Sequence, residues 1–179
     1  MITLSHAPDD TGGGNRMHLA GELHGEQDTE ALGAALAAGL KPGLVIHLLG
    51  DLGAGKTTLV RGMLRALGHQ GKVKSPTYTL IEPYSVSRLN LYHFDFYRFN
   101  EPEEYLDAGL DEYFSGTGAC LVEWPSKASP YVAQPDVEVL LEVSPNGRRF
   151  RATALTEAGQ SCLTTSKSTL HTQPDCPPA

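Results

Sequence analysis

The stretch Gly50-Asp51-Leu52-Gly53-Ala54-Gly55-Lys56-Thr57 governs the interpretation of this 179-residue sequence. It fits the pattern G-x-x-x-x-G-K-[ST], in which the backbone N–H groups of a glycine-rich loop surround phosphate oxygens. The lysine reaches the outer phosphates, and the hydroxyl of Thr57 is a hard oxygen ligand of the kind that Mg²⁺ prefers. These residues, called the phosphate loop (residues 50–57) from here on, predict a nucleoside triphosphate site.

The residues on either side of the phosphate loop provide the context that the motif requires. Residues 44–49 form a short apolar run, which predicts a buried strand. Residues 57–67 carry apolar side chains at helical spacing and end at Gly68, which predicts a helix. Such a helix points its positive dipole end toward a bound phosphate. The sequence contains no Asn-Lys pair, the start of a common guanine-recognition motif, and this favours ATP over GTP.

The remaining pattern predicts an α/β protein. Apolar spacing predicts further helices over residues 29–40 and 101–108, and strands over residues 77–84, 89–97, 121–124, 137–143 and 150–155, with a hairpin connection at 85–88. Strands that alternate with helices form parallel sheets, whereas adjacent strand pairs form antiparallel edges. We therefore expect a P-loop NTPase fold: a mostly parallel central sheet with antiparallel edge strands and helices on both faces.

Composition sets the domain limits and the compartment that we expect. Residues 1–18 predict a flexible leader, within which Met17 is an alternative start, residues 19–163 predict the ATPase domain, and the Ser/Thr/Pro-rich residues 164–179 predict a disordered tail. The net charge of −7 does not favour direct nucleic-acid binding, which relies on basic surface. Three widely spaced cysteines and the lack of a long apolar segment predict a reduced, cytoplasmic protein without a membrane span.

Two acidic residues end predicted strands and are candidates for the chemistry. Asp95 lies late in residues 89–98, and Glu123 lies at the end of the run 120–124. Ligands of open α/β sheets bind beyond the carboxyl ends of the strands, so both carboxylates can face the phosphate loop. Either one can bind the metal or orient the attacking water, and the sequence leaves these two roles undivided. Ser75-Pro76-Thr77 is a candidate nucleotide-sensing segment, whereas His93 is interpreted as a packed strand residue.

Four motifs together resemble the TsaE family, also called YjeE, across residues 19–163. They are the phosphate loop with Thr58, Val73-Lys74-Ser75-Pro76-Thr77-Tyr78, Tyr92-His93-Phe94-Asp95-Phe96-Tyr97-Arg98 and Leu121-Val122-Glu123-Trp124-Pro125. The resemblance implies a cytoplasmic ATPase that supports formation of N6-threonylcarbamoyladenosine at position 37 of tRNAs that read ANN codons. It also implies TsaD and TsaB as the protein partners. The carbamoyl transfer belongs to TsaD, so tRNA is contacted only indirectly, and ATP hydrolysis resets the partner complex.

The resemblance also implies a set of site residues. Lys56, Asp95 and Glu123 are the expected catalytic residues. Thr57 and Glu123 fall on Mg²⁺ positions, and Asp95 is a further candidate metal ligand as a Walker B-like acid. The expected ATP-binding residues are Thr29, Gly50, Gly53, Ala54, Gly55, Lys56, Thr57, Thr58, the switch-like Thr77, Trp124 and Arg148.

The mechanism that we expect is in-line attack of water on the γ-phosphate, with Lys56, the loop amides and Mg²⁺ neutralising the developing charge. No obvious arginine finger follows the loop, so hydrolysis is expected to be weak until a partner stimulates it. Two alternatives remain open: a small-molecule kinase, which needs an acceptor pocket and usually an arginine-rich lid, and a nucleotide-gated binding module without turnover.

Overall fold

An eight-stranded sheet organises residues 2–5, 16–86 and 89–172, which the computed structural model describes. Its strand order is β1-β2-β8-β7-β3-β6-β5-β4. The strands are β1 (Thr3–Ser5), β2 (His18–Leu23), β3 (Val45–Leu49), β4 (Ile81–Val86), β5 (Leu89–Asp95), β6 (Ala119–Glu123), β7 (Val137–Ser144) and β8 (Gly147–Ala154). The helices are α1 (Glu26–Ala37), α2 (Lys56–Ala66), α3 (Glu104–Asp107) and α4 (Glu157–Thr172), with 3₁₀ turns η1 (Leu110–Phe114) and η2 (Pro125–Ala128).

The centre of the sheet is parallel and both sides are antiparallel. Strands β7, β3, β6 and β5 run in the same direction, β4 pairs antiparallel with β5, and β8, β2 and β1 form an antiparallel wing beyond β7. This arrangement confirms the predicted fold class. Because parallel strands end at the same edge, Asp95 and Glu123 become direct register partners at the ends of β5 and β6.

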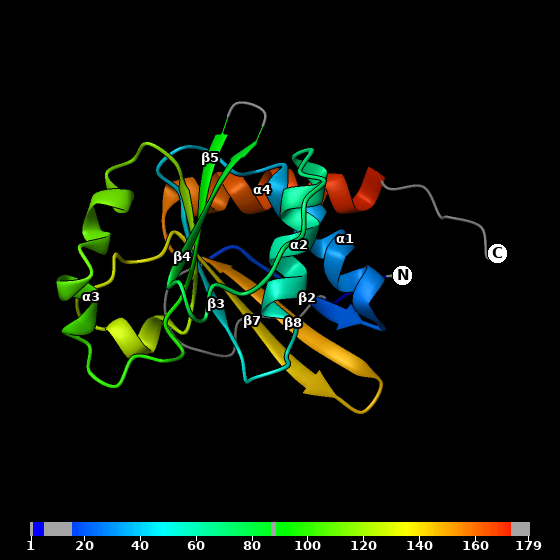
Figure 1. Cartoon of the computed structure of the whole chain (residues 1–179). Helices are drawn as coiled ribbons and strands as arrows, with labels where there is room; N and C mark the ends of the chain where they lie inside the picture. Colours follow the sequence, from blue (N-terminus) through cyan, green and yellow to red (C-terminus); the bar gives the residue numbers. More distant parts are fainter. Residues whose placement is uncertain (1, 6–15, 87–88, 173–179) are drawn as a thin grey trace.

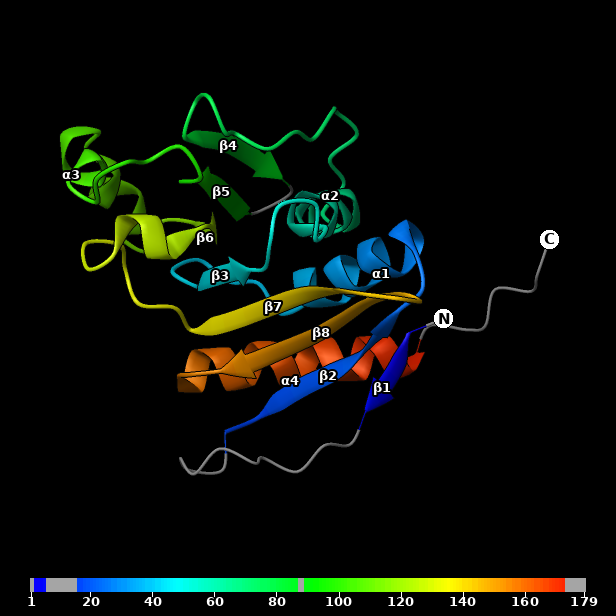
Figure 2. The ribbon, with the colours of Figure 1, turned by 90° about the horizontal axis from the view of Figure 1, so that it is seen from below.

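Helices cover both faces of the sheet (Figures 1 and 2). Helices α1, α2 and α4 lie on one face, where their apolar residues pack with those of β3, β7 and β8 in one hydrophobic cluster. The second face carries α3, η1 and η2 over a cluster rich in aromatic rings, including the stacked pair Phe96 and Phe99 with centroids 4.9 Å apart. The sheet core is therefore buried on both sides, as parallel strands require.

Helices α1 and α2 approach each other so closely that two glycines form the contact. A Cβ atom at Gly33 would lie 2.2 Å from the Leu59 carbonyl oxygen, and one at Gly62 would lie 2.2 Å from the Glu30 carbonyl oxygen. The Glu30 carboxylate also accepts hydrogen bonds from Arg61 (2.7 Å) and Arg65 (2.6 Å) on α2. Helix α1 is thus held directly against the helix that follows the phosphate loop.

Helix α4 corrects the expected disordered tail at 164–179. Residues 164–172 continue the helix that begins at Glu157, and residues 173–179 lie outside the described part of the chain. Cys162 and Leu163 are buried in the core, with Leu170 packed against it. The Ser and Thr hydroxyls donate to carbonyls four residues earlier, as Ser166 does to Cys162 (2.8 Å). A polar composition therefore concealed a helix with one apolar side, because its hydroxyl groups are satisfied within the helix.

Other boundaries also differ from the sequence-based expectation. The expected leader of residues 1–18 contains β1, which pairs with β2, although residues 6–15 lie outside the described residues. The strand expected over 77–84 begins only at Ile81, because residues 77–80 form a turn that the Leu80 amide closes on the Pro76 carbonyl (2.7 Å). The hairpin connection expected at 85–88 is shorter, since β4 extends to Val86, and residues 87–88 are not described.

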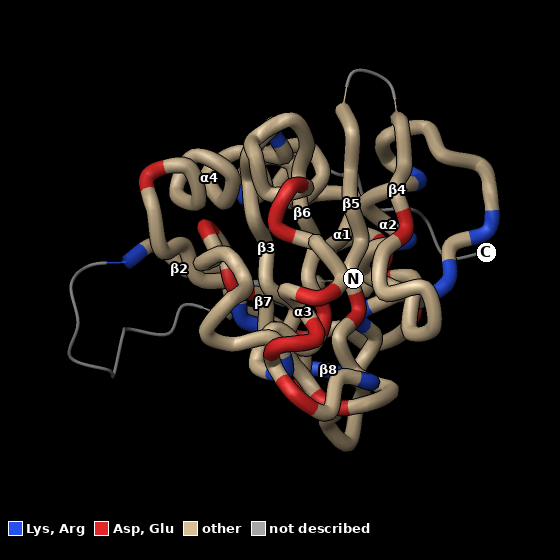
Figure 3. Tube along the Cα trace, turned by 60° about the vertical axis from the view of Figure 1, so that its left-hand side comes forward, with Lys and Arg blue, Asp and Glu red and all other residues tan. Residues whose placement is uncertain are grey.

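The acidic charge is unevenly distributed along the fold. Figure 3 shows carboxylate positions gathered along the segment that contains α3 and η1. They are Glu101, Glu103, Glu104, Asp107, Asp111 and Glu112. Among the described residues, no helix is both long and apolar enough to cross a membrane.

Candidate functional site

The phosphate loop joins β3 to α2 and depends on its glycines. Gly50 and Gly55 have φ angles of +129° and +108°, in the region that glycine alone occupies without strain. A Cβ atom at Gly50 would also lie 2.2 Å from the Leu141 carbonyl oxygen of β7. The loop can therefore keep this shape only if glycine stands at these positions.

Lys56 is the first residue of α2, and its side chain is buried. Its ammonium group donates to the carbonyls of Gly50 (2.6 Å) and Asp51 (3.0 Å) and lies 4.4 Å from the ring centroid of Trp124. Burial lowers the pKa of Lys56, while the negative charges of Glu123, Asp95 and Asp51 act in the opposite direction. The positive charge is thus concentrated inside the loop, where a phosphate would meet it.

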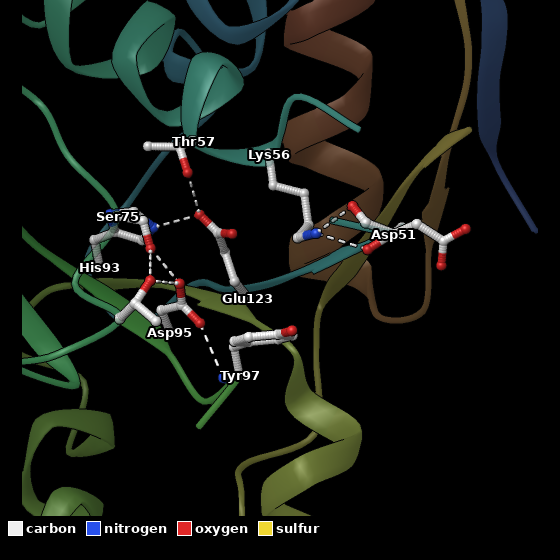
Figure 4. Close-up of polar contacts among 10 residues, drawn as sticks. Asp51, Lys56, Thr57, Ser75, His93, Asp95, Tyr97 and Glu123 are labelled. Carbon is white, nitrogen blue, oxygen red and sulfur yellow. Dashed lines mark hydrogen bonds and ion pairs between the residues drawn. The ribbon is translucent and has the colours of Figure 1, made fainter. Parts of the chain in front are cut away.

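Glu123 ends β6 and faces the start of α2 (Figure 4). One carboxylate oxygen, Oε1, accepts hydrogen bonds from the Thr57 hydroxyl (3.1 Å) and from Nε2 of His93 (2.9 Å). Sequence reasoning treated His93 as a packing residue, and its contact with Glu123 depends on the pairing of β5 with β6. The structure therefore joins Thr57 and Glu123, the two expected Mg²⁺ positions, in direct contact.

Asp95 ends β5 and binds the segment that precedes β4. Its Oδ2 atom accepts hydrogen bonds from the hydroxyls of Ser75 and Thr77, the latter at 2.8 Å, and its Oδ1 atom accepts one from the Tyr97 amide (2.9 Å). The Asp95 amide donates to the carbonyl of Leu80 (3.1 Å), a residue in the left-handed region with φ 65°. Asp95 therefore fixes the turn at residues 75–80 through both its side chain and its backbone.

These residues line a cavity of about 320 Å³, and most of the predicted site residues meet there. Its walls comprise Leu52, Gly53, Gly55, Lys56, Thr57, Thr58, Ser75, Thr77, Asp95, Tyr97, Glu123, Trp124 and Arg148. Leu52 and Tyr97 were not predicted as site residues. Tyr97 is partly exposed, and its ring centroid lies 5.1 Å from that of Trp124. The sequence could have indicated Tyr97 only as an aromatic residue two positions after the acid that ends a strand.

Three predicted ATP-binding residues lie outside the cavity wall. Thr29 is buried on α1 behind Gly55, and its hydroxyl donates to the Gly25 carbonyl (3.1 Å). The Gly50 carbonyl accepts the Lys56 ammonium, and the Ala54 carbonyl accepts Nε of Arg148 (2.7 Å). The carbonyls of Gly50 and Ala54 thus take part in contacts that shape the loop, Thr29 lies behind it, and contacts of all three with nucleotide remain a prediction.

The oxygen atoms in the cavity suit Mg²⁺ that is carried by a triphosphate. Thr57 and Glu123 supply a hydroxyl and a carboxylate, both hard ligands. Among the described residues, no group of three His, Cys, Asp or Glu side chains could hold a metal ion by itself. Mg²⁺ usually keeps several waters and binds through one or two protein groups together with substrate phosphates. The residues present therefore fit Mg²⁺ arriving with a nucleotide, and they do not form a separate metal cage.

The parallel sheet, the glycine-rich loop and the helix that follows it define a protein with the P-loop NTPase fold. The sequence model of the family described as "Threonylcarbamoyl adenosine biosynthesis protein TsaE" matches residues 23–150. The chain belongs to this TsaE family.

Individual relatives agree with the family assignment. The protein named tRNA threonylcarbamoyladenosine biosynthesis protein TsaE from Haemophilus influenzae is 43% identical over 120 residues, which cover 67% of this chain and 76% of the relative. The protein of the same name from Bacillus subtilis is 44% identical over 116 residues, covering 65% and 72%. The crystal structure of B. subtilis YdiB superposes with a TM-score of 0.74 at 33% identity, covering 87% of this chain and 99% of that one.

Proposed function

We propose that this chain binds ATP with Mg²⁺ in the cavity and hydrolyses ATP to sustain the turnover of a TsaD–TsaB complex in tRNA N6-threonylcarbamoyladenosine formation. The observation that carries the proposal is the contact of Thr57 with Glu123 at 3.1 Å, beside the buried ammonium of Lys56. This arrangement places one hydroxyl, one carboxylate and one positive charge beside the phosphate loop. The pathway comes from the names of the family and its relatives.

The side chains present can divide the work of phosphoryl transfer. Lys56 and the amides of the phosphate loop bind the β- and γ-phosphates, and Thr57 and Glu123 would hold Mg²⁺, which supplies charge neutralisation on the phosphate oxygens. A water molecule attacks the γ-phosphorus, the bond to the bridging oxygen breaks, and ADP, inorganic phosphate and a proton are released. The carboxylate of Glu123, which has one oxygen facing the cavity, orients either the attacking water or a metal-bound water.

We expect the rate of ATP hydrolysis to depend on a partner, because the cavity offers few positive charges to the γ-phosphate. Among the described residues, Arg148 is the arginine in its wall, and its Nε atom is engaged with the Ala54 carbonyl. Hydrolysis by the isolated chain should therefore be slow. A group supplied by the partner complex could increase the rate by about 10³–10⁵, as activating proteins do for other P-loop hydrolases. The proposal places this reaction in the cytoplasm, with tRNA bound by the partners.

The decisive experiment measures phosphate release from ATP by the chain alone and with purified TsaD and TsaB, together with the yield of threonylcarbamoyladenosine on tRNA. We expect slow multiple turnover alone, stimulation by the pair, and loss of both activities in Lys56→Ala. GTP in place of ATP should support less product. Strictly stoichiometric nucleotide binding would favour the binding module, transfer of phosphate to a small acceptor would favour the kinase, and full activity of Lys56→Ala would overturn the proposal.

A further inference from the structure

A buried histidine lies directly behind the carboxylate that faces the phosphate loop. His93 is on β5, its side chain is fully buried, and its Nε2 atom lies 2.9 Å from Oε1 of Glu123. Among the described residues, its other ring nitrogen, Nδ1, is buried and has no hydrogen-bond partner. The contact with Glu123 is therefore the polar interaction that the structure gives this ring.

The surroundings of His93 make a pure packing role a poor explanation. The neighbouring β5 residues Leu91 and Phe94 are buried hydrophobic residues, and an apolar side chain at position 93 would fill the space without burying an unpaired nitrogen. The network assigns the ring proton to Nε2, because a carboxylate oxygen can only accept a hydrogen bond. The bare Nδ1 is then an acceptor without a donor, a smaller penalty than a buried N–H without an acceptor.

The hydrogen bond fixes which oxygen of Glu123 faces the cavity. His93 and Thr57 both donate to Oε1, and Figure 4 shows the second oxygen directed toward the Lys56 side of the site, away from His93. A glutamate has three rotatable side-chain bonds, and two donors on one oxygen restrict its orientation. Hydrogen-bonded neighbours of metal-binding carboxylates orient them in this way, and their removal typically lowers metal affinity or activity about 10–100-fold.

We propose that His93 is a positioning residue: its imidazole donates from Nε2 to Glu123 and holds that carboxylate in the orientation that binds the magnesium–nucleotide complex. The inference rests on the proposed function, since it assigns Glu123 to the metal. It adds a residue behind the site, outside the cavity wall, whose hydrogen bond controls the orientation of the Glu123 carboxylate and so its affinity for the metal.

The test compares two replacements of His93 with a matched control on another strand. His93→Phe removes the donor and keeps a ring, whereas the side-chain amide of His93→Gln can place an N–H close to the position of Nε2. The control is His47→Phe, because His47 is also buried, on β3, but its Nε2 atom contacts the Ala133 carbonyl (3.0 Å) and no site carboxylate. Thermal unfolding of each variant identifies any that fail to fold.

The first measurement is the Mg²⁺ concentration that half-saturates the Trp124 fluorescence change in the presence of ADP. We expect this concentration to rise about 10–100-fold in His93→Phe, by less than about tenfold in His93→Gln, and to stay unchanged in His47→Phe. ADP binding in EDTA should be the same in all four proteins. A folded His93→Phe with wild-type Mg²⁺ dependence, or equal losses in His93→Phe and His93→Gln, would overturn the inference.

The second measurement is independent of nucleotide, metal and turnover. Two-bond ¹H–¹⁵N correlation spectra of the ligand-free chain, with the signals assigned by comparison with His93→Gln, should show a proton on Nε2 of His93. Protonation at Nδ1 alone would overturn the inference even if ATP is bound and hydrolysed. A wild-type chain without any Mg²⁺-dependent nucleotide binding would instead overturn the proposed function, and the metal-positioning role with it.

Discussion

Asp95 and Glu123 occupy equivalent places in the sheet and have different surroundings. Each ends a parallel strand, they are register partners, and each is 3% exposed. Both oxygens of Asp95 accept hydrogen bonds, from the Ser75 and Thr77 hydroxyls and from the Tyr97 amide. Only one oxygen of Glu123 is used within the described residues, by Thr57 and His93. Position at a strand end thus brings both acids to the site, and their neighbours give them different hydrogen-bond partners.

The different hydrogen-bond partners bear on the two roles, metal binding and water orientation, that the sequence left undivided between the two acids. Asp95 accepts hydrogen bonds from Ser75 and Thr77 through one oxygen and from the Tyr97 amide through the other, and these contacts hold the segment at residues 75–77 beside the cavity. Glu123 keeps one oxygen without a hydrogen bond among the described residues, which agrees with the proposed role of binding the metal or its water. In Figure 4 the dashed lines form one group around Asp95 and another around Glu123, and no dashed line joins these two groups.

The largest effect should come from Glu123→Gln, which keeps the shape and removes the charge. We expect ATP hydrolysis to fall about 10²–10³-fold, the usual loss when one group that stabilises developing charge is removed. The measurement is phosphate release at saturating Mg²⁺, with exposed Glu142→Gln on β7 as the control. Activity within about threefold of wild type would contradict the role assigned to Glu123, because such a change is well below the loss expected for that group.

A matched pair of hydroxyl deletions should sharpen the comparison. Thr57→Val removes the hydroxyl next to Glu123, and Thr77→Val removes one next to Asp95, each with little change in shape. We expect hydrolysis to fall about 100-fold in the first, which loses a metal ligand, and about tenfold in the second, which loosens a supporting segment. Equal losses in the two variants would mean that the carboxylates do not have separate tasks.

Asp95→Ala should loosen the turn at residues 75–80. Hydrogen bonds to a charged group contribute about 1.5–3 kcal/mol each, and Asp95 accepts three. We expect amide hydrogen exchange across residues 77–80 to accelerate about 10–100-fold, because local opening becomes easier. Exchange in Glu123→Ala provides the comparison and should stay at the wild-type rate in this turn. Faster exchange there in both variants would remove the distinction.

A smaller effect should come from His47, which makes the free energy of unfolding depend on pH. Burial lowers the pKa of His47 to about 4, so the folded chain keeps this imidazole neutral while the unfolded chain takes up a proton near pH 6.5. Its contribution to stability is therefore full above pH 6.5 and is lost as the pH falls toward 4. Between pH 7 and 5 the free energy of unfolding should fall by about 1–2 kcal/mol from this residue.

Urea unfolding at the two pH values measures this change, and His47→Phe should remove it. If the variant loses as much stability as the wild-type chain between pH 7 and 5, then other groups carry the pH dependence.

The sequence predicted the parts of the site that local chemistry determines. The phosphate loop needs glycine at positions of positive φ, and the parallel strands bring Asp95 and Glu123 to one edge, so both features could be inferred without coordinates. The contact of His93 with Glu123 could not, because it joins side chains on two strands whose pairing was unknown. Helix α4 was missed because its Ser and Thr residues satisfy their own hydroxyls on the helix backbone, which average composition does not reveal.

The glycine contact between α1 and α2 has a mechanical consequence. With the Gly33 and Gly62 backbones touching, no layer of side chains remains that could repack if one helix slid past the other. Helix α2 begins at Lys56, the residue that follows the last glycine of the loop. The close packing of α1 therefore restrains the position of the helix that the phosphate loop enters, and with it the end of the loop at Gly55.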